Sequence, residues 1–170
     1  IDLPEDHVAE GRMRIRIGYN ITSAAVLFNS NQTQSGATLT VDDNDPAGVD
    51  VLTTSPLPLA EAGGEAAYAV KLSSQPLEHV TVHVHAELGH GGHPQLIYSP
   101  ENLTFTNETW NDTQTVRLSA VDDDVDEGNN HSVRVWHTTD SADPMYAGDS
   151  ASGVLNVSIA DDDNAGVRMS

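Results

Sequence analysis

Apolar and polar residues alternate along most of this chain with a period of two. Between Tyr68 and Leu72, and again between Val80 and Val84, every second residue is large and apolar. Further runs with the same alternation are Met13–Ile17, Leu103–Phe105, Val116–Ala120, Val133–Val135 and Leu155–Ile159. This period is typical of a strand that buries one face. No stretch of a dozen residues shows the helical spacing i, i+3, i+4, i+7, so we expect strands and no helices.

Clusters of Gly, Pro, Asn, Asp and Ser separate these runs and suit turns. Short strands that follow one another about every ten residues, with turn residues between them, predict a sandwich or a barrel. The pattern therefore predicts an all-β fold in which each strand gives one face to the core.

A segment near residue 40 recurs near residue 160. Leu39-Thr-Val-Asp-Asp-Asn-Asp-Pro-Ala-Gly-Val49 returns as Val157-Ser-Ile-Ala-Asp-Asp-Asp-Asn-Ala-Gly-Val167, an offset of 118 residues. A unit of this length is a sandwich domain rather than a solenoid repeat. We predict that residues 1–45 are the C-terminal third of a preceding repeat, 46–163 a complete sandwich, and 164–170 the first strand of a following repeat.

Two explanations of the partial repeats stay open at this point. The chain is either an excerpt from a long tandem array, or its incomplete ends are completed by neighbouring chains, as in strand donation. In both cases we expect something to cover residues 1–45, because a partial sandwich would expose its inner face and strand edges.

The charge of the chain excludes several classes of partner. There are 26 acidic and 7 basic residues, a net charge of −19, and no cysteine. Such an excess of acid disfavours nucleic acid and anionic membrane surfaces. The lack of cysteine excludes disulfides, thiolate zinc sites and cysteine nucleophiles. No run of about 18 apolar residues is present, so we expect no membrane insertion.

Fifteen of the 26 acidic residues fall in four short stretches. At the 118-residue offset these reduce to two places in one repeat: the loop before the penultimate strand and the tail after the last strand. Because alternate loops of a sandwich lie at the same end, both clusters can converge there. Adjacent carboxylates repel by about 1 kcal/mol or more at a surface dielectric, and a hard divalent cation relieves that repulsion.

Ca²⁺ suits such loops because it takes six to eight oxygen ligands. The predicted ligands of the later copy are Glu61, Asp122, Asp123, Asp124, Asp126, Glu127, Asp161, Asp162 and Asp163. Those of a weaker, earlier copy are Asp42, Asp43 and Asp45, beside a fourth acidic stretch of Asp2, Glu5, Asp6 and Glu10. The EF-hand spacing is absent, and the alternative interpretation is that acidic loops keep a surface protein soluble.

Asn-X-Ser/Thr sequons are more frequent than chance would give in a polar chain of this length. They occur at Asn20, Asn31, Asn102, Asn107, Asn111, Asn130 and Asn156. We therefore expect N-linked glycans and a secreted or cell-surface, extracellular location, the alternative being a chance excess.

Five of the eight histidines lie between His79 and His93, and His83, His85 and Glu87 share the polar face of one predicted strand. Paired histidines on alternate strand positions can bind Zn²⁺ or Cu²⁺, or can be exposed polar residues without a ligand. No H-E-x-x-H, G-x-S-x-G, P-loop or G-x-G-x-x-G motif is present, and we expect no enzymatic activity from this segment.

The order of these segments resembles a Calx-beta-type repeat, as found in sodium–calcium exchanger regulatory domains and integrin beta-4. The resembling stretches are Glu61–Glu65 with Tyr68–Leu72, Pro100–Thr106 with Trp110-Asn111, Gln114–Val116 running to Ala120–Asp124 and Asp126–Gly128, Tyr146–Gly148, and Leu155–Asp163. The resemblance implies a seven-stranded immunoglobulin-like sandwich with Ca²⁺ at one end, held by Glu61 and the later acidic residues. In the earlier copy Asn44 stands where the later one has Asp162, so we expect a weaker or incomplete site there.

Together these features predict a structural or adhesive extracellular glycoprotein. It would form a fibre or surface stalk from tandem or strand-complemented sandwich units, stiffened by Ca²⁺ at the junctions. Its partners would be neighbouring copies of itself and other surface glycoproteins. The alternatives are a ligand- or glycan-binding module of a secreted protein and an accessory domain of a larger secreted enzyme.

Overall fold

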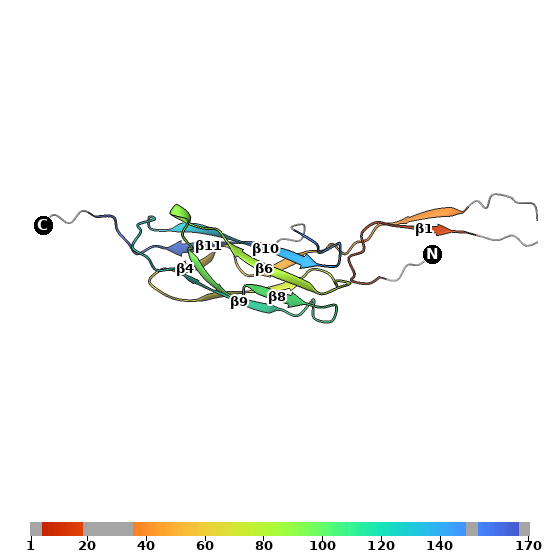
Figure 1. Ribbon diagram of the computed structural model, residues 1–170, viewed down its shortest axis with the longest axis horizontal. Coiled ribbons are helices and arrows are strands. Elements are labelled where there is room, and N and C mark those ends of the chain that lie inside the picture. The colour runs from red at the N-terminus through yellow and green to blue at the C-terminus, as the bar shows by residue number, and fades with distance from the viewer. Residues whose placement is uncertain (1–4, 19–35, 149–152, 167–170) are drawn as a thin grey trace, which may run out of the picture.

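Two sheets, antiparallel apart from one parallel strand pair, form a sandwich in the computed structural model, which describes residues 5–18, 36–148 and 153–166. One sheet has the order β4-β11-β10-β6-β8: Leu57–Ala60, Val154–Ala160, His131–Ser141, Val80–Ala86 and Asn102–Phe105. The other has the order β3-β5-β9-β7: Val49–Leu52, Ala66–Leu72, Gln114–Ala120 and Leu96–Ser99. Within the described residues the only helical element is the single 3₁₀ turn η2, His90–Gly92. The prediction of an all-β, immunoglobulin-like sandwich is confirmed (Figure 1).

The chain crosses the length of the sandwich seven times, and two of these crossings are each divided into two strands, which gives nine strands. The chain leaves one sheet and enters the other between β3 and β4, at Pro56, and between β7 and β8, at Pro100. Proline has no N–H to give to a ladder, so it suits a point where strand pairing stops. The seven-stranded architecture implied by the resemblance is thus present, with two of its strands divided between the sheets.

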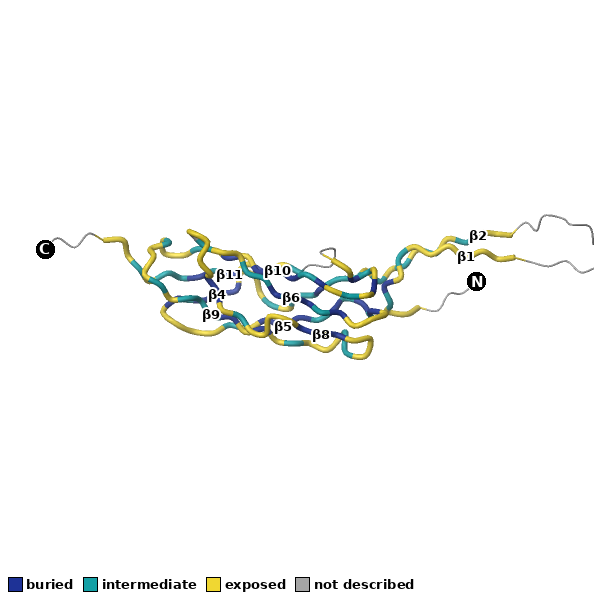
Figure 2. The backbone as a smooth tube through the Cα atoms, viewed as in Figure 1, coloured by how far each residue is buried: buried dark blue, intermediate teal, exposed yellow. Residues whose placement is uncertain are grey.

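The core lies between the two sheets and follows the alternation in the sequence. On β6, Val80, Val82 and Val84 are buried, and the alternating His83 and His85 point to the outer face. Tyr68, Val70 and Leu72 of β5 face them from the other sheet. Figure 2 shows the same inward burial along the central strands, with exposed loops at both ends.

The N-terminal hairpin lies outside the sandwich (Figure 1). It pairs β1, Met13–Ile17, with β2, Ala37–Val41, in the register Met13↔Val41. This register equals that of β10 with β11, His131↔Ile159, shifted by the offset of the repeat. In the hairpin Met13, Ile15 and Ile17 are exposed and Leu39 and Val41 are half-buried, whereas in the sandwich the second sheet covers the equivalent side chains.

Residues 5–9 connect the hairpin to the sandwich. Val8 forms a parallel bridge with Gln75, and Ala9 is fully buried. The ring of His7 lies 5.9 Å from that of Trp110, measured between centroids. At the other end, residues 164–166 form no strand, and residues 167–170 lie outside the described residues, so the division into repeats stays a prediction.

Candidate divalent-cation site

Parallel pairing of β4 with β11 creates the site. Ala60 pairs with Ala160, and the backbone N–H of Glu61 donates to the carbonyl oxygen of Ala160 at 3.0 Å. Glu61 and Asp161 are therefore the first residues beyond two neighbouring strands that run in the same direction. This juxtaposition places their carboxyl groups together at one end of the sandwich.

Glu61 is the central residue of the site. It is 3% exposed, and neither of its carboxylate oxygens has a hydrogen-bond partner. Ligand atoms of Glu61, Asp161 and Asp163 all lie within 4.8 Å of one another. Burial raises the pKa of Glu61 to about 7, and the negative charges of Asp161, Glu127 and Asp123 add to the shift. The site therefore concentrates negative charge, and no Lys or Arg of the described residues forms an ion pair with Glu61, Asp161 or Asp163.

Hydrogen bonds order the two aspartates that face Glu61. The N–H groups of Asp163 and Glu127 donate to Asp161 at 3.0 and 2.9 Å. These two bonds keep the pKa of Asp161 below its usual value, and the bond from Asp163 has the larger effect. The Asp161 carboxylate therefore stays ionised. Asp163 differs, because burial and then the charges of neighbouring aspartates raise its pKa, and its Oδ2 is buried without a partner.

A second group of ligand atoms adjoins the first through Glu61. Glu61, Glu127 and His131 also have ligand atoms within 4.8 Å of one another. Gln95 donates to Glu127 Oε1 at 2.8 Å, which leaves Glu127 Oε2 without a hydrogen-bond partner. Sequence reasoning missed His131 and Gln95. The signal that could have found His131 is the succession of two alternating runs, 133–135 and 155–159. Paired as neighbouring strands with Val133 opposite Val157, they place His131 opposite Ile159, two residues before Asp161.

The remaining predicted ligands of the later copy surround the two groups without joining them. Asp126 accepts from Ala165 N at 2.6 Å and from Gly128 N at 3.0 Å, so it fastens the tail to the loop. Asp123 accepts from Val125 N at 2.8 Å. The other members, which are exposed and belong to neither group, are Asp122, Asp124 and Asp162.

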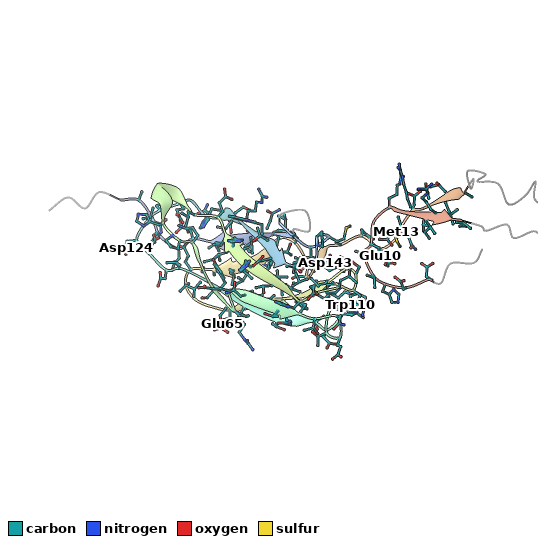
Figure 3. The ribbon with its side chains drawn as sticks, turned by 45° about the vertical axis from the view of Figure 1, so that its right-hand side comes forward. Glu10, Met13, Glu65, Trp110, Asp124 and Asp143 are labelled. Carbon is teal, nitrogen blue, oxygen red and sulfur yellow. The ribbon has the colours of Figure 1, made fainter. Side chains whose placement is uncertain are left out.

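The earlier acidic cluster lies at the opposite end of the sandwich, where Glu10 is labelled in Figure 3, far from Asp124. Its hydrogen bonds repeat those of the later copy. Asp43 accepts hydrogen bonds from Glu10 N and Gly11 N at 2.8 and 3.0 Å. Both bonds lower the pKa of Asp43, and the bond from Gly11 has the larger effect. Asp45 N donates to Asp43 at 3.3 Å.

Two exposed pairs occupy the rest of the earlier cluster, Arg12 with Asp42 at 2.6 Å and Asn44 with Glu5 at 2.6 Å. Among the described residues of this cluster, no three ligand atoms are grouped within 4.8 Å, and no carboxylate is buried as Glu61 is.

The histidine strand and the sequons other than Asn130, which directly precedes His131, are not part of the site. The asparagines of the five described sequons are exposed, and these are Asn102, Asn107, Asn111, Asn130 and Asn156. Asn20 and Asn31 fall outside the described residues. On the outer face of β6, His83 is hydrogen-bonded to Asn102 at 2.6 Å and His85 to Thr138 at 2.9 Å. The His85 ring also stacks on Trp136, with centroids 5.4 Å apart.

Comparisons with known proteins give the fold alone. No family model and no curated protein matches the chain. Among solved structures, the Salmonella enterica SafA pilin in complex with the SafB chaperone is 14% identical, covering 70% of this chain and 57% of that one at a TM-score of 0.49. The PapD-like domain 7 of human CEP192 is 9% identical, covering 86% and 100% at 0.47. The apo Calx CBD1 domain is 19% identical, covering 63% and 90% at 0.42.

Several other similar structures are chaperones, one of them described as periplasmic. The chain spans a little more than half the length of these chaperones. The fold is thus an immunoglobulin-like or PapD-like sandwich, and a Calx-beta domain is one neighbour among many of other kinds.

These neighbours overturn the predicted function. They are mostly chaperones and PapD-like domains, so the prediction of a fibre- or stalk-forming glycoprotein is wrong, and its alternative of a ligand- or glycan-binding module is not supported either. Two of the structures contain a chaperone with a pilin or adhesion subunit, which is a protein partner but not a fibre of identical copies. At these identities the similar structures show the fold and do not bear on cation binding or glycosylation in this chain.

Within the described ranges, no helix is long and apolar enough to cross a membrane.

Proposed function

We propose that this sandwich is a divalent-cation-binding domain whose cation is Ca²⁺. The observation that carries the proposal is Glu61, a carboxylate 3% exposed whose two oxygens have no hydrogen-bond partner and which has a ligand atom within 4.8 Å of those of Asp161 and Asp163. A buried carboxylate without a hydrogen bond or a counter-charge costs several kcal/mol in principle. A divalent cation between the three carboxyl groups removes that cost.

The ligand type favours Ca²⁺ at Glu61, Asp161 and Asp163, because Ca²⁺ prefers oxygen ligands and accepts irregular geometry. Backbone carbonyls and water fill the remaining positions in such sites. The family resemblance in the sequence points the same way, since it implies acidic ligands at these positions; membership of the Calx-beta family is part of this proposal.

Binding would join three segments at one end of the fold. Glu61 begins the turn after β4, Asp161 and Asp163 lie in the tail after β11, and Asp126 already holds Ala165 of that tail. The bound cation would hold the tail against the loops. The proposed role is therefore cation-dependent ordering of this end of the domain, in a protein that meets Ca²⁺ outside the cytoplasm and carries N-linked glycans at its exposed sequons.

Calorimetric titration with CaCl₂ tests the proposal. Asp163→Asn removes a ligand of the group, and Asp162→Asn, one residue away, removes an exposed carboxylate that is not in it. We expect the first variant to bind Ca²⁺ at least about tenfold more weakly and the second to bind as the parent does. Equal affinity in all three proteins, or no heat with the parent, would refute the site.

A further inference from the structure

We propose a second metal site at Glu61, Glu127 and His131 that takes a transition-metal dication of the Zn²⁺ class. It rests on the proposed function in that it shares Glu61 with the Ca²⁺ ligands. Its own ligand atoms lie within 4.8 Å of one another. All three side chains have buried atoms without a hydrogen-bond partner: both oxygens of Glu61, Oε2 of Glu127, and both ring nitrogens of His131.

The donor set distinguishes this site from its neighbour. Ca²⁺ takes oxygen ligands, whereas an imidazole with two carboxylates suits Zn²⁺. His131 Nδ1 lies 3.5 Å from Glu127 Oε2, and the side chains are only 18% and 10% exposed. A histidine in this position has no hydrogen bond to replace the water that it lost on burial. A metal ion held by the ring and the carboxylate would satisfy both groups.

The protein already fixes the orientation of the second carboxylate. Gln95, 1% exposed, donates to Glu127 Oε1 at 2.8 Å, and the Glu127 N–H donates to Asp161 at 2.9 Å. The first contact holds the carboxylate through Oε1 and the second holds the backbone of the residue, while Oε2 has no partner. Hydrogen bonds of this kind to a ligand raise metal affinity, because they prepay the ordering of the side chain.

A cavity adjoins the site and provides room for a ligand that is not part of the protein. It measures about 560 Å³ and is lined by Glu127 and His131 together with Leu88, Val125 and Val133. Three protein ligands with an open fourth position are the usual arrangement of an exchangeable zinc site. We therefore expect water, or a small anion, as the fourth ligand.

Titration with ZnCl₂ in Ca²⁺-free buffer, with Co²⁺ absorption as the spectroscopic readout, tests the proposal. His131→Gln should weaken Zn²⁺ binding at least about tenfold and abolish the intense visible bands of four-coordinate Co²⁺, with Ca²⁺ affinity nearly unchanged. His85→Gln is the matched control, because His85 is another half-buried histidine, on the outer face of β6. Circular dichroism of each variant checks that the sandwich is folded.

The outcomes separate the two sites. Zn²⁺ binding that survives His131→Gln and disappears in His85→Gln would overturn this proposal and leave the Ca²⁺ site standing. Zn²⁺ binding that requires His131 in a protein without Ca²⁺ affinity would support this proposal and refute the proposed function. Asp163→Asn should lower the affinity for Ca²⁺ and spare that for Zn²⁺; equal losses of both would contradict two distinct ligand sets.

Discussion

At the scale of single residues, Glu61 determines the behaviour of the site. Without a cation, its buried charge faces Asp161 and Asp163 with no hydrogen bond to offset desolvation. Glu61→Gln keeps the shape and allows the amide to donate to these aspartates. At pH 8 with a chelator present, we expect the free energy of unfolding of this variant, measured by urea denaturation, to exceed that of the parent by on the order of 1 kcal/mol. A less stable variant would contradict the account of Glu61 as an unbalanced buried charge.

His137 is a second buried titratable residue, within the core. Its Nδ1 donates to Gly153 O at 2.9 Å, so Nε2 accepts from the Tyr68 hydroxyl, also at 2.9 Å. Burial lowers the pKa of His137 below its usual 6.5, with the nearby His85 adding to the shift. The unfolded chain therefore binds a proton at higher pH than the folded one.

The linkage between this pKa and stability gives a pH dependence. As pH falls below about 6.5, the unfolded state gains protons that the folded state does not, and stability is lost. The raised pKa of Glu61 stabilises the folded state over the same interval, so the effect of His137 is read as the difference between the parent and His137→Gln in urea denaturation at pH 7 and pH 5. His137→Gln, whatever its absolute stability, should lose less over the same interval. An identical loss in both proteins would show that other groups cause it.

At the scale of elements, Tyr146 ties the loop after β10 to the turn after β5. Its hydroxyl donates to Ser74 O at 2.6 Å and accepts from Ser74 N at 3.2 Å, and all these atoms are buried. Tyr146→Phe leaves the Ser74 groups without partners. We expect a loss of about 1–3 kcal/mol of unfolding free energy, against little change for Tyr98→Phe, whose ring is half-buried. Equal effects in thermal melts would argue against the hydroxyl contacts.

The elements also show how far the sequence predicts this structure. The alternation predicted β5, β6, β9, β10 and β11, because each buries every second side chain over several residues. It did not predict that β4 lies parallel to β11, since parallel neighbours about 100 residues apart leave no local signal.

The same distinction applies to the site. Acid content marked Glu61, Asp161 and Asp163, but it marked the exposed Asp122, Asp124 and Asp162 equally, because charge in the sequence does not reveal burial. Selection of the ligands depends on tertiary packing around the end of the sandwich.

At the scale of the whole molecule, the sandwich and the N-terminal hairpin differ in what covers them. Met13, Ile15 and Ile17 are 40%, 37% and 41% exposed, whereas Val133 and Val135 at equivalent positions are buried. A hairpin of two strands is marginally stable in water. Hydrogen exchange read by mass spectrometry should therefore find β1 and β2 exchanging orders of magnitude faster than β10 and β11. Comparable protection would mean that the hairpin's apolar face is covered in solution.

The central claim is that Ca²⁺ binds this domain through Glu61. Ligand binding to the folded state alone stabilises it by about 2.7 kcal/mol at a free concentration one hundred times the dissociation constant.

The most direct test is the melting temperature with chelator and with saturating CaCl₂, compared between Glu61→Gln and Glu65→Gln, an exposed glutamate at the end of the same turn (Figure 3). The account predicts that Ca²⁺ raises the melting temperature of the parent and of Glu65→Gln by several degrees and leaves that of Glu61→Gln unchanged. A Ca²⁺-induced rise of the same size in Glu61→Gln, or none in the parent, would contradict it.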